Sequence, residues 1–134
     1  MKSWELQVAI KTKLDATSGL TDLLSNGTDS IRDDIREDDG FPYISIYDLA
    51  SNENDTQVGN GIETLISIHA YSRYDGMKEV KQIMDEVYGA LHSKSLTISG
   101  DNHISTRFSS SNTFLEADGK TRHGTINFVI DTSD

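Results

Sequence analysis

The sequence contains no cysteine and only one proline. Without cysteine the chain forms no disulfide and offers no thiolate as a nucleophile or metal ligand. Long apolar runs are also missing, because charged residues interrupt the N-terminal segment every few positions. No run approaches the ~20 apolar residues that span a bilayer. We therefore expect neither a signal peptide nor a membrane span, and the composition is compatible with synthesis in the cytosol.

Basic residues are scarce, since 12 Lys and Arg stand against 22 Asp and Glu and give a net charge of −10. Proteins that bind nucleic acid or anionic membranes directly need a basic face. The arginines here are scattered among acidic residues, so no such face is predicted. Two interpretations of the charge remain open: solubility alone, or a surface that DNA passes without sticking.

Motifs for catalysis or cofactor binding are absent. The histidines form no HExxH pair and no ligand spacing with carboxylates; they are His69, His92, His103 and His123. Gly59-Asn60-Gly61 precedes a strand pattern rather than a helix, which is the wrong order for a phosphate-binding loop. We predict no catalytic residue, no cofactor-binding residue and no metal ligand. An acid–base pair of Asp118 and His123 is the only arrangement that would support an enzyme.

An acidic stretch between residues 33 and 39 invites a calcium hypothesis. It lacks the central glycine and the terminal glutamate that an EF-hand loop requires. The sequence therefore favours a solvated acidic turn over a metal site. Its carboxylates are Asp33, Asp34, Glu37, Asp38 and Asp39.

The strongest positive signal is an amphipathic helix over Gly76–His92, preceded by Asp75 as a candidate cap. One face is apolar at helical spacing and the opposite face is charged. The apolar positions are Val80, Ile83, Met84, Val87, Tyr88 and Leu91. His92 in the last turn would complement the negative end of the helix. A helix with one apolar face needs a sheet or another helix to cover.

A first helix is predicted over Ser3–Asp15, with Ser3 as its N-cap. Its narrow apolar stripe consists of Leu6, Ala9, Ile10 and Leu14, and Trp4 and Val8 lie beside the stripe. A short helical turn over Thr21–Leu24 should follow, after Thr17, Ser18 and Gly19 break the first helix.

Alternating apolar residues predict strands between and after the helices. His69 lies in one of them and is interpreted as a half-buried sheet residue. One strand has apolar residues on both faces, Tyr43, Tyr47 and Leu49 on one and Ile44, Ile46 and Ala50 on the other, so it is expected inside the sheet. Thr113–Leu115 extends one strand if a bulge intervenes. Ser51–Gly61 is expected to be a long hairpin loop, and Asp118-Gly119 predicts a tight turn. The predicted strands span Ser30–Ile35, Phe41–Ala50, Ile62–Arg73, Leu96–Ser99, His103–Ser109 and Thr121–Asp131.

These elements predict an α+β fold in one domain over residues 1–134. The sheet is mostly antiparallel, and the N-terminal helix and the long amphipathic helix pack on it.

The order of these features resembles the phage tail completion family, the tail-terminator proteins of siphovirus-type phages and gene transfer agents. The resemblance spans the whole chain. It rests on Phe41-Pro42-Tyr43 before a long strand, on the segment from His69 to Arg73 that ends the next strand, and on the helix ending at Ala90-Leu91-His92. It ends with the segment from Asp118 to Gly124, which introduces the last strand.

The resemblance implies a structural protein of the virion tail, made in the host cytoplasm and not an enzyme. Such proteins form a ring, typically a hexamer, on the head-proximal end of the tail tube, stop its polymerisation and join it to the head. The implied partners are further copies of the chain, the major tail tube protein and a head-tail connector or head-closure protein. DNA would pass through the lumen without specific binding, and no membrane is involved.

A ring needs two different patches that meet on neighbouring subunits. We expect the Ser51–Gly61 loop and the Asp118–His123 hairpin to supply contacts to a neighbour, the tube or the connector. Three alternatives remain open: a head-closure or connector protein of the neck, a cytosolic small-molecule-binding module with a pocket between helix and sheet, and an enzyme that uses His123 and Asp118.

Overall fold

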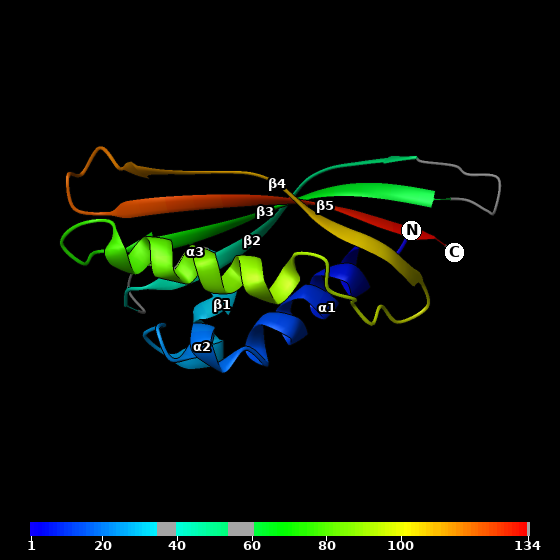
Figure 1. Ribbon diagram of the computed structural model, residues 1–134, viewed down its shortest axis with the longest axis horizontal. Coiled ribbons are helices and arrows are strands. Elements are labelled where there is room, and N and C mark those ends of the chain that lie inside the picture. Colours follow the sequence, from blue (N-terminus) through cyan, green and yellow to red (C-terminus); the bar gives the residue numbers. More distant parts are fainter. Residues whose placement is uncertain (35–39, 54–60, 134) are drawn as a thin grey trace.

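The computed structural model describes residues 1–34, 40–53 and 61–133. It contains one mostly antiparallel sheet with all three α-helices on the same face (Figure 1), and the predicted α+β class is confirmed. In chain order the elements are α1 (Ser3–Asp15), α2 (Ser18–Thr21), the 3-10 helix η1 (Gly27–Ser30), β1 (Ile31–Arg32), β2 (Tyr43–Glu53), β3 (Gly61–Ser72), α3 (Lys78–Leu91), β4 (Asn102–Leu115) and β5 (Arg122–Ser133).

The sheet has the strand order β1-β2-β3-β5-β4. The short strand β1 pairs in parallel with the start of β2, and every other pair is antiparallel. Bulges interrupt β2 between Asp48 and Ala50, and β4 between Phe108 and Ser110. The second bulge confirms that one strand continues through Thr113–Leu115. The chain crosses from β3 through α3 to β4 at the far edge, and β5 then returns between β3 and β4.

The core lies between the sheet and the helices. Residues at alternate positions of β2, β3 and β5 point toward α3 and are buried, as alternation in a half-covered sheet requires. They include Ile44, Ile46, Ile66, Ile68, Ile126, Phe128 and Ile130. From α3 they meet Val80, Ile83, Met84, Val87, Ala90 and Leu91. The predicted helical face is confirmed except at Tyr88, which is exposed and stacks on His92.

Strand β5 approaches α3 closely at Gly124. A Cβ added there would lie 2.5 Å from Met84 Sδ and 3.0 Å from Val80 Cγ2. The absence of a side chain therefore sets the distance between the helix and the sheet at this point.

Helix α1 has the predicted bounds, and its predicted stripe of four apolar residues is buried. The predicted caps are wrong. Lys2 precedes α1 and Met77 precedes α3, and neither helix has a side-chain cap. Ser3 lies inside α1, and Asp75 is too early in the chain to cap α3.

Three further predictions need correction. The short helix comes earlier than expected, at Ser18–Thr21, because the turn that ends α1 is complete by Thr17. The segment Leu96–Ser99 is not a strand: Leu96 and Ile98 are buried against the helices without sheet pairing. His92 follows α3, and its Nδ1 accepts a hydrogen bond from the Phe108 backbone N–H at 3.1 Å.

Strand β2 lies inside the sheet only at its beginning, because β1 pairs with Ile44 and Ser45 alone. From Asp48 to Glu53 the side chains are exposed, including the apolar Leu49. None of the helices in the described part of the chain is long and apolar enough to cross a membrane.

Candidate functional site

The face of the sheet away from α3 carries a row of aromatic side chains across four strands. Tyr43, Tyr71, His123 and Phe114 are register partners in β2, β3, β5 and β4 respectively. Neighbouring ring centroids lie 4.8, 4.4 and 4.7 Å apart. In β2, β3 and β5 the residues of this row have odd numbers, as alternation along a strand predicts. In β4 a bulge shifts the alternation, so the sequence did not predict that Phe114 belongs to the row. Offset ring contacts of this kind stabilise cross-strand pairs.

His123 of this row meets a second histidine, His69, which lies beside the row. His69 Nδ1 and His123 Nε2 are 2.6 Å apart, so one nitrogen donates a hydrogen bond to the other. His69 is half-buried in its strand, as predicted. Burial lowers the pKa of His69 and, together with the charge that His69 would carry, lowers the pKa of His123 to about 4. At neutral pH the pair is therefore uncharged.

Further polar atoms complete the surroundings of the histidine pair. Ser67 Oγ lies 2.9 Å from His69 Nε2, and Glu116 Oε1 lies 3.4 Å from His123 Nδ1. Within the described residues, no group of three or more His, Cys, Asp and Glu side chains is placed to hold a metal ion.

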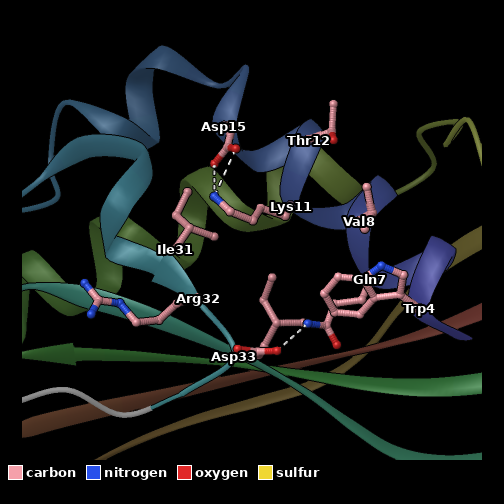
Figure 2. A pocket seen from close by; sticks show the side chains of 10 residues that line it. Trp4, Gln7, Val8, Lys11, Thr12, Asp15, Ile31, Arg32 and Asp33 are labelled. Atoms are coloured by element: carbon pink, nitrogen blue, oxygen red, sulfur yellow. Dashed lines mark hydrogen bonds and ion pairs between the residues drawn. The ribbon is translucent and has the colours of Figure 1, made fainter.

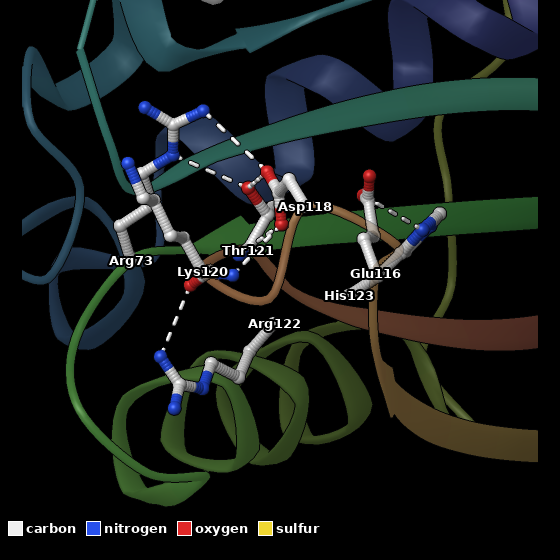
Figure 3. A network of polar contacts seen from close by, with 7 residues as sticks. All are labelled: Arg73, Glu116, Asp118, Lys120, Thr121, Arg122 and His123. Carbon is white, nitrogen blue, oxygen red and sulfur yellow. Dashed lines mark hydrogen bonds and ion pairs between the residues drawn. The ribbon is translucent and has the colours of Figure 1, made fainter.

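The turn between β4 and β5 is organised by Asp118 (Figure 3). Its carboxylate accepts hydrogen bonds from the backbone N–H of Lys120 and of Thr121, each at 2.8 Å, and from the Thr121 hydroxyl at 2.6 Å. These bonds, the Thr121 hydroxyl first, lower the Asp118 pKa to about 2. Gly119 follows with φ +71°, the left-handed conformation that favours glycine. Asp118 thus fixes the turn.

The Asp118–His123 pair that an enzyme would need is not formed. The Asp118 carboxylate is bonded within its own turn, and Arg73 lies 3.7 Å away on the same side. The His123 ring instead contacts Glu116 (Figure 3) and His69. The two residues serve different local structures, and the pairing that the enzyme alternative would use is not observed.

A groove of about 450 Å³ runs between α1 and the start of the sheet (Figure 2). Trp4 and Val8 line it, and their side chains are 62% and 45% exposed. Four of its polar side chains pair with each other: Gln7 donates to Asp33 at 2.9 Å, and Lys11 donates to Asp15 at 3.0 Å. These four groups are engaged within the groove rather than left to orient a small ligand.

A second hollow of about 690 Å³ lies on the other side of α1, toward residues 95–99. Trp4, Val8 and Thr12 line both hollows. These three residues, the α1 ridge, therefore stand between two depressions. The sequence placed Trp4 and Val8 beside the buried stripe but did not indicate the hollows, which depend on residues distant in the chain.

The two expected contact elements have different outcomes. Asp118–His123 is confirmed as a hairpin turn leading into β5. The predicted Ser51–Gly61 loop begins later, because β2 and β3 continue to pair as far as Glu53 and Ile62. Residues 54–60, like Glu37, Asp38 and Asp39 of the acidic stretch, lie outside the described residues.

Comparison with known proteins gives a family and a fold. A family model described as "Tail completion protein gp17" matches residues 8–132. A chain in the structure titled "Virion of native gene transfer agent (GTA) particle" is similar with a TM-score of 0.86 and 18% identity, over 99% of this chain and 98% of that one.

A second similar fold is found in the structure titled "Structure of bacteriophage SPP1 gp17 protein". Its TM-score is 0.62 with 22% identity, over 97% of this chain and 94% of that one. No curated protein sequence matches the chain.

Proposed function

The chain belongs to the tail completion protein gp17 family, and on that premise we propose that it caps the head-proximal end of a phage-type tail tube as a ring. In this role it stops tube polymerisation and joins the tail to the head connector or head-closure protein. Its partners are further copies of itself and the major tail tube protein. The single observation that carries the proposal is the family match over residues 8–132.

The open edges of the sheet support assembly with other subunits. At one edge β1 covers only Ile44 and Ser45, so the rest of β2 has an uncovered edge within the described residues. At the other edge, Ser93 and His92 bond Thr106 and Phe108 of β4. Ser110–Leu115 beyond them contains neither charge nor proline, the usual protections of a free edge.

The two long hairpins also favour an assembly role. The β2–β3 strands project past the helical layer at one end of the sheet, and the β4–β5 turn lies at the opposite end (Figure 1). A ring needs different patches on opposite sides of one subunit. The two hairpins and the sheet edges at β2 and β4 provide such patches. We propose six copies per ring, a single domain over residues 1–134, and a purely structural role without catalysis.

The test is deletion of the gene from its phage or gene transfer agent, with electron microscopy of the particles. Loss of a terminator leaves tails of abnormal and variable length that carry no head, and supplying the wild-type gene in trans restores normal particles. Headless tails of normal length would instead identify a neck protein that acts after tube completion. Normal, infectious particles would contradict any role in tail completion.

A further inference from the structure

The α1 ridge has the composition of a docking surface that the folded chain leaves uncovered. Trp4 is the only tryptophan of the sequence, and 62% of it is exposed. Val8 follows one turn later and is 45% exposed. An exposed tryptophan next to an exposed valine, with a hollow on each side, is typical of an anchor that inserts into a partner.

Three lysines lie around the ridge of an otherwise acidic protein. Lys2 and Lys94 are exposed and Lys13 is half-buried, and none of the three forms an ion pair within the described residues. Lys13 and Glu5 line the hollow beside Trp4, and Lys2, at the N-terminal end of α1, lies against Gly100. The charged groups of the other hollow largely neutralise each other through Lys11 and Asp15. The occupant should therefore carry apolar and acidic groups together.

An acidic surface with an exposed apolar residue exists on the chain itself. The part of β2 from Asp48 to Glu53 has exposed side chains, an uncovered strand edge and Leu49 at 55% exposure. Asp48 and Glu53 have no ion-pair partner in the described part of the chain. This segment lies in the β2–β3 hairpin, which extends past the helices (Figure 1).

We propose that the α1 ridge of one subunit receives the Asp48–Glu53 segment of the next subunit, with Leu49 beside Trp4 and the acidic groups facing Lys2 and Lys13. The inference rests on the ring proposed above and names its two patches. Pairing of one ridge with the same ridge of a second copy is disfavoured because it would bring the same lysines together. Since ridge and acidic segment are different patches, the contact repeats from subunit to subunit, and it forms a ring when the rotation between subunits closes.

The single tryptophan makes the contact directly measurable in the wild-type chain. Fluorescence emission and acrylamide quenching of Trp4 are followed from micromolar to millimolar protein, and sedimentation velocity gives the mass of the same samples. We expect the emission to shift to the blue and quenching to fall in parallel with the rise in mass. A rise in mass with unchanged Trp4 emission would show that the subunits meet elsewhere. A monomer at every concentration would also overturn the proposal.

Charge exchange tests both patches at once. Lys2→Glu with Lys13→Glu, and separately Asp48→Lys with Glu53→Lys, should each weaken association at least about tenfold. An equimolar mixture of the two variants should regain it, because every contact in the mixture is again between opposite charges. Variants that associate like wild type, or a mixture that stays monomeric, would refute the assignment.

Trp4→Ala should weaken association by a similar factor, whereas two matched changes should not. Tyr74→Ala removes a similarly exposed aromatic side chain from the turn between β3 and α3, and Lys81→Glu reverses an exposed charge on α3. If Trp4 becomes buried only when purified tail tubes are added, the occupant is a tube subunit and this inference fails. The capping role would stand in that case, because the gene deletion tests it independently.

Discussion

At the level of single residues, the histidine pair links the stability of the sheet to pH. Because the folded state lowers the pKa values of both imidazoles below their usual range, it binds fewer protons than the unfolded chain in mild acid. The contribution of the neutral pair to the unfolding free energy is fully present above about pH 6.5, the ordinary histidine pKa. This contribution is lost as the pH falls from there toward 4.

Wild-type protein should therefore lose about 1 kcal/mol of unfolding free energy between pH 7 and pH 5. The loss is this small because solvent reaches both rings and screens the charge. His123→Gln should remove most of that loss. Urea unfolding at the two pH values measures it. His69→Gln should act non-additively with His123→Gln, because the two residues share one hydrogen bond. Equal pH slopes in wild type and His123→Gln would contradict this account.

The Asp118 carboxylate gives a residue-scale prediction with the opposite pH range. Its pKa lies below the ordinary value of aspartate, at about 2. Its contribution is therefore present above pH 4 and is lost as the pH falls from about 4 toward 2. Asp118→Asn should lower the melting temperature at pH 7, and the difference from wild type should shrink at low pH.

Asp75→Asn is the matched control, since Asp75 is fully exposed and its nearest cation, Arg122, is 4.0 Å away. It should leave the melting temperature unchanged. An Asp118→Asn protein as stable as wild type at pH 7 would show that the turn does not depend on the carboxylate.

At the level of whole elements, the sequence predicted α1 and the long antiparallel strands because their apolar periodicity matches their burial. It failed where local and tertiary signals differ. Leu96 and Ile98 alternate like a strand but are buried by the helices. The His69–His123 pair depends on the register between β3 and β5. A single sequence does not specify this register, because no hairpin turn joins these two strands.

Gly124 and Gly89 offer a matched test of how α3 sits on the sheet. Gly124→Ala places a methyl group against Met84 and Val80, so we expect a loss of about 1–2 kcal/mol in unfolding free energy, softened by the flexible methionine. Gly89→Ala has no atom within 4 Å of the new methyl and lies on the exposed side of α3. It should stabilise the protein by roughly 0.5–1 kcal/mol.

Chemical denaturation measures the unfolding free energy of the two variants and shows whether side-chain packing or helix propensity determines the effect of each substitution. If Gly124→Ala lowers the unfolding free energy and Gly89→Ala raises it, β5 packs closely under α3. Stabilisation by both changes would show that the helix can lift from the sheet at no cost.

At the level of the whole molecule, the sheet order could not be predicted from the sequence. The strands are consecutive in the chain only as far as β3, and β5 then inserts between β3 and β4. This order leaves β4 and most of β2 with uncovered edges in the described residues. The same topology creates the two hairpin arms, so the surfaces available for assembly are consequences of the strand order rather than of any motif.

The net charge of −10 leads to a prediction for the whole assembled protein. Phosphate binding releases counterions only where cations gather, and the 12 basic residues are outnumbered by 22 acidic ones. Neither the monomer nor the ring should bind double-stranded DNA at moderate salt. Fluorescence anisotropy of labelled duplex, measured with increasing protein at low and at physiological ionic strength, should stay flat. Binding that weakens steeply with salt would reveal a basic surface created by assembly, and would contradict a lumen through which DNA passes without being held.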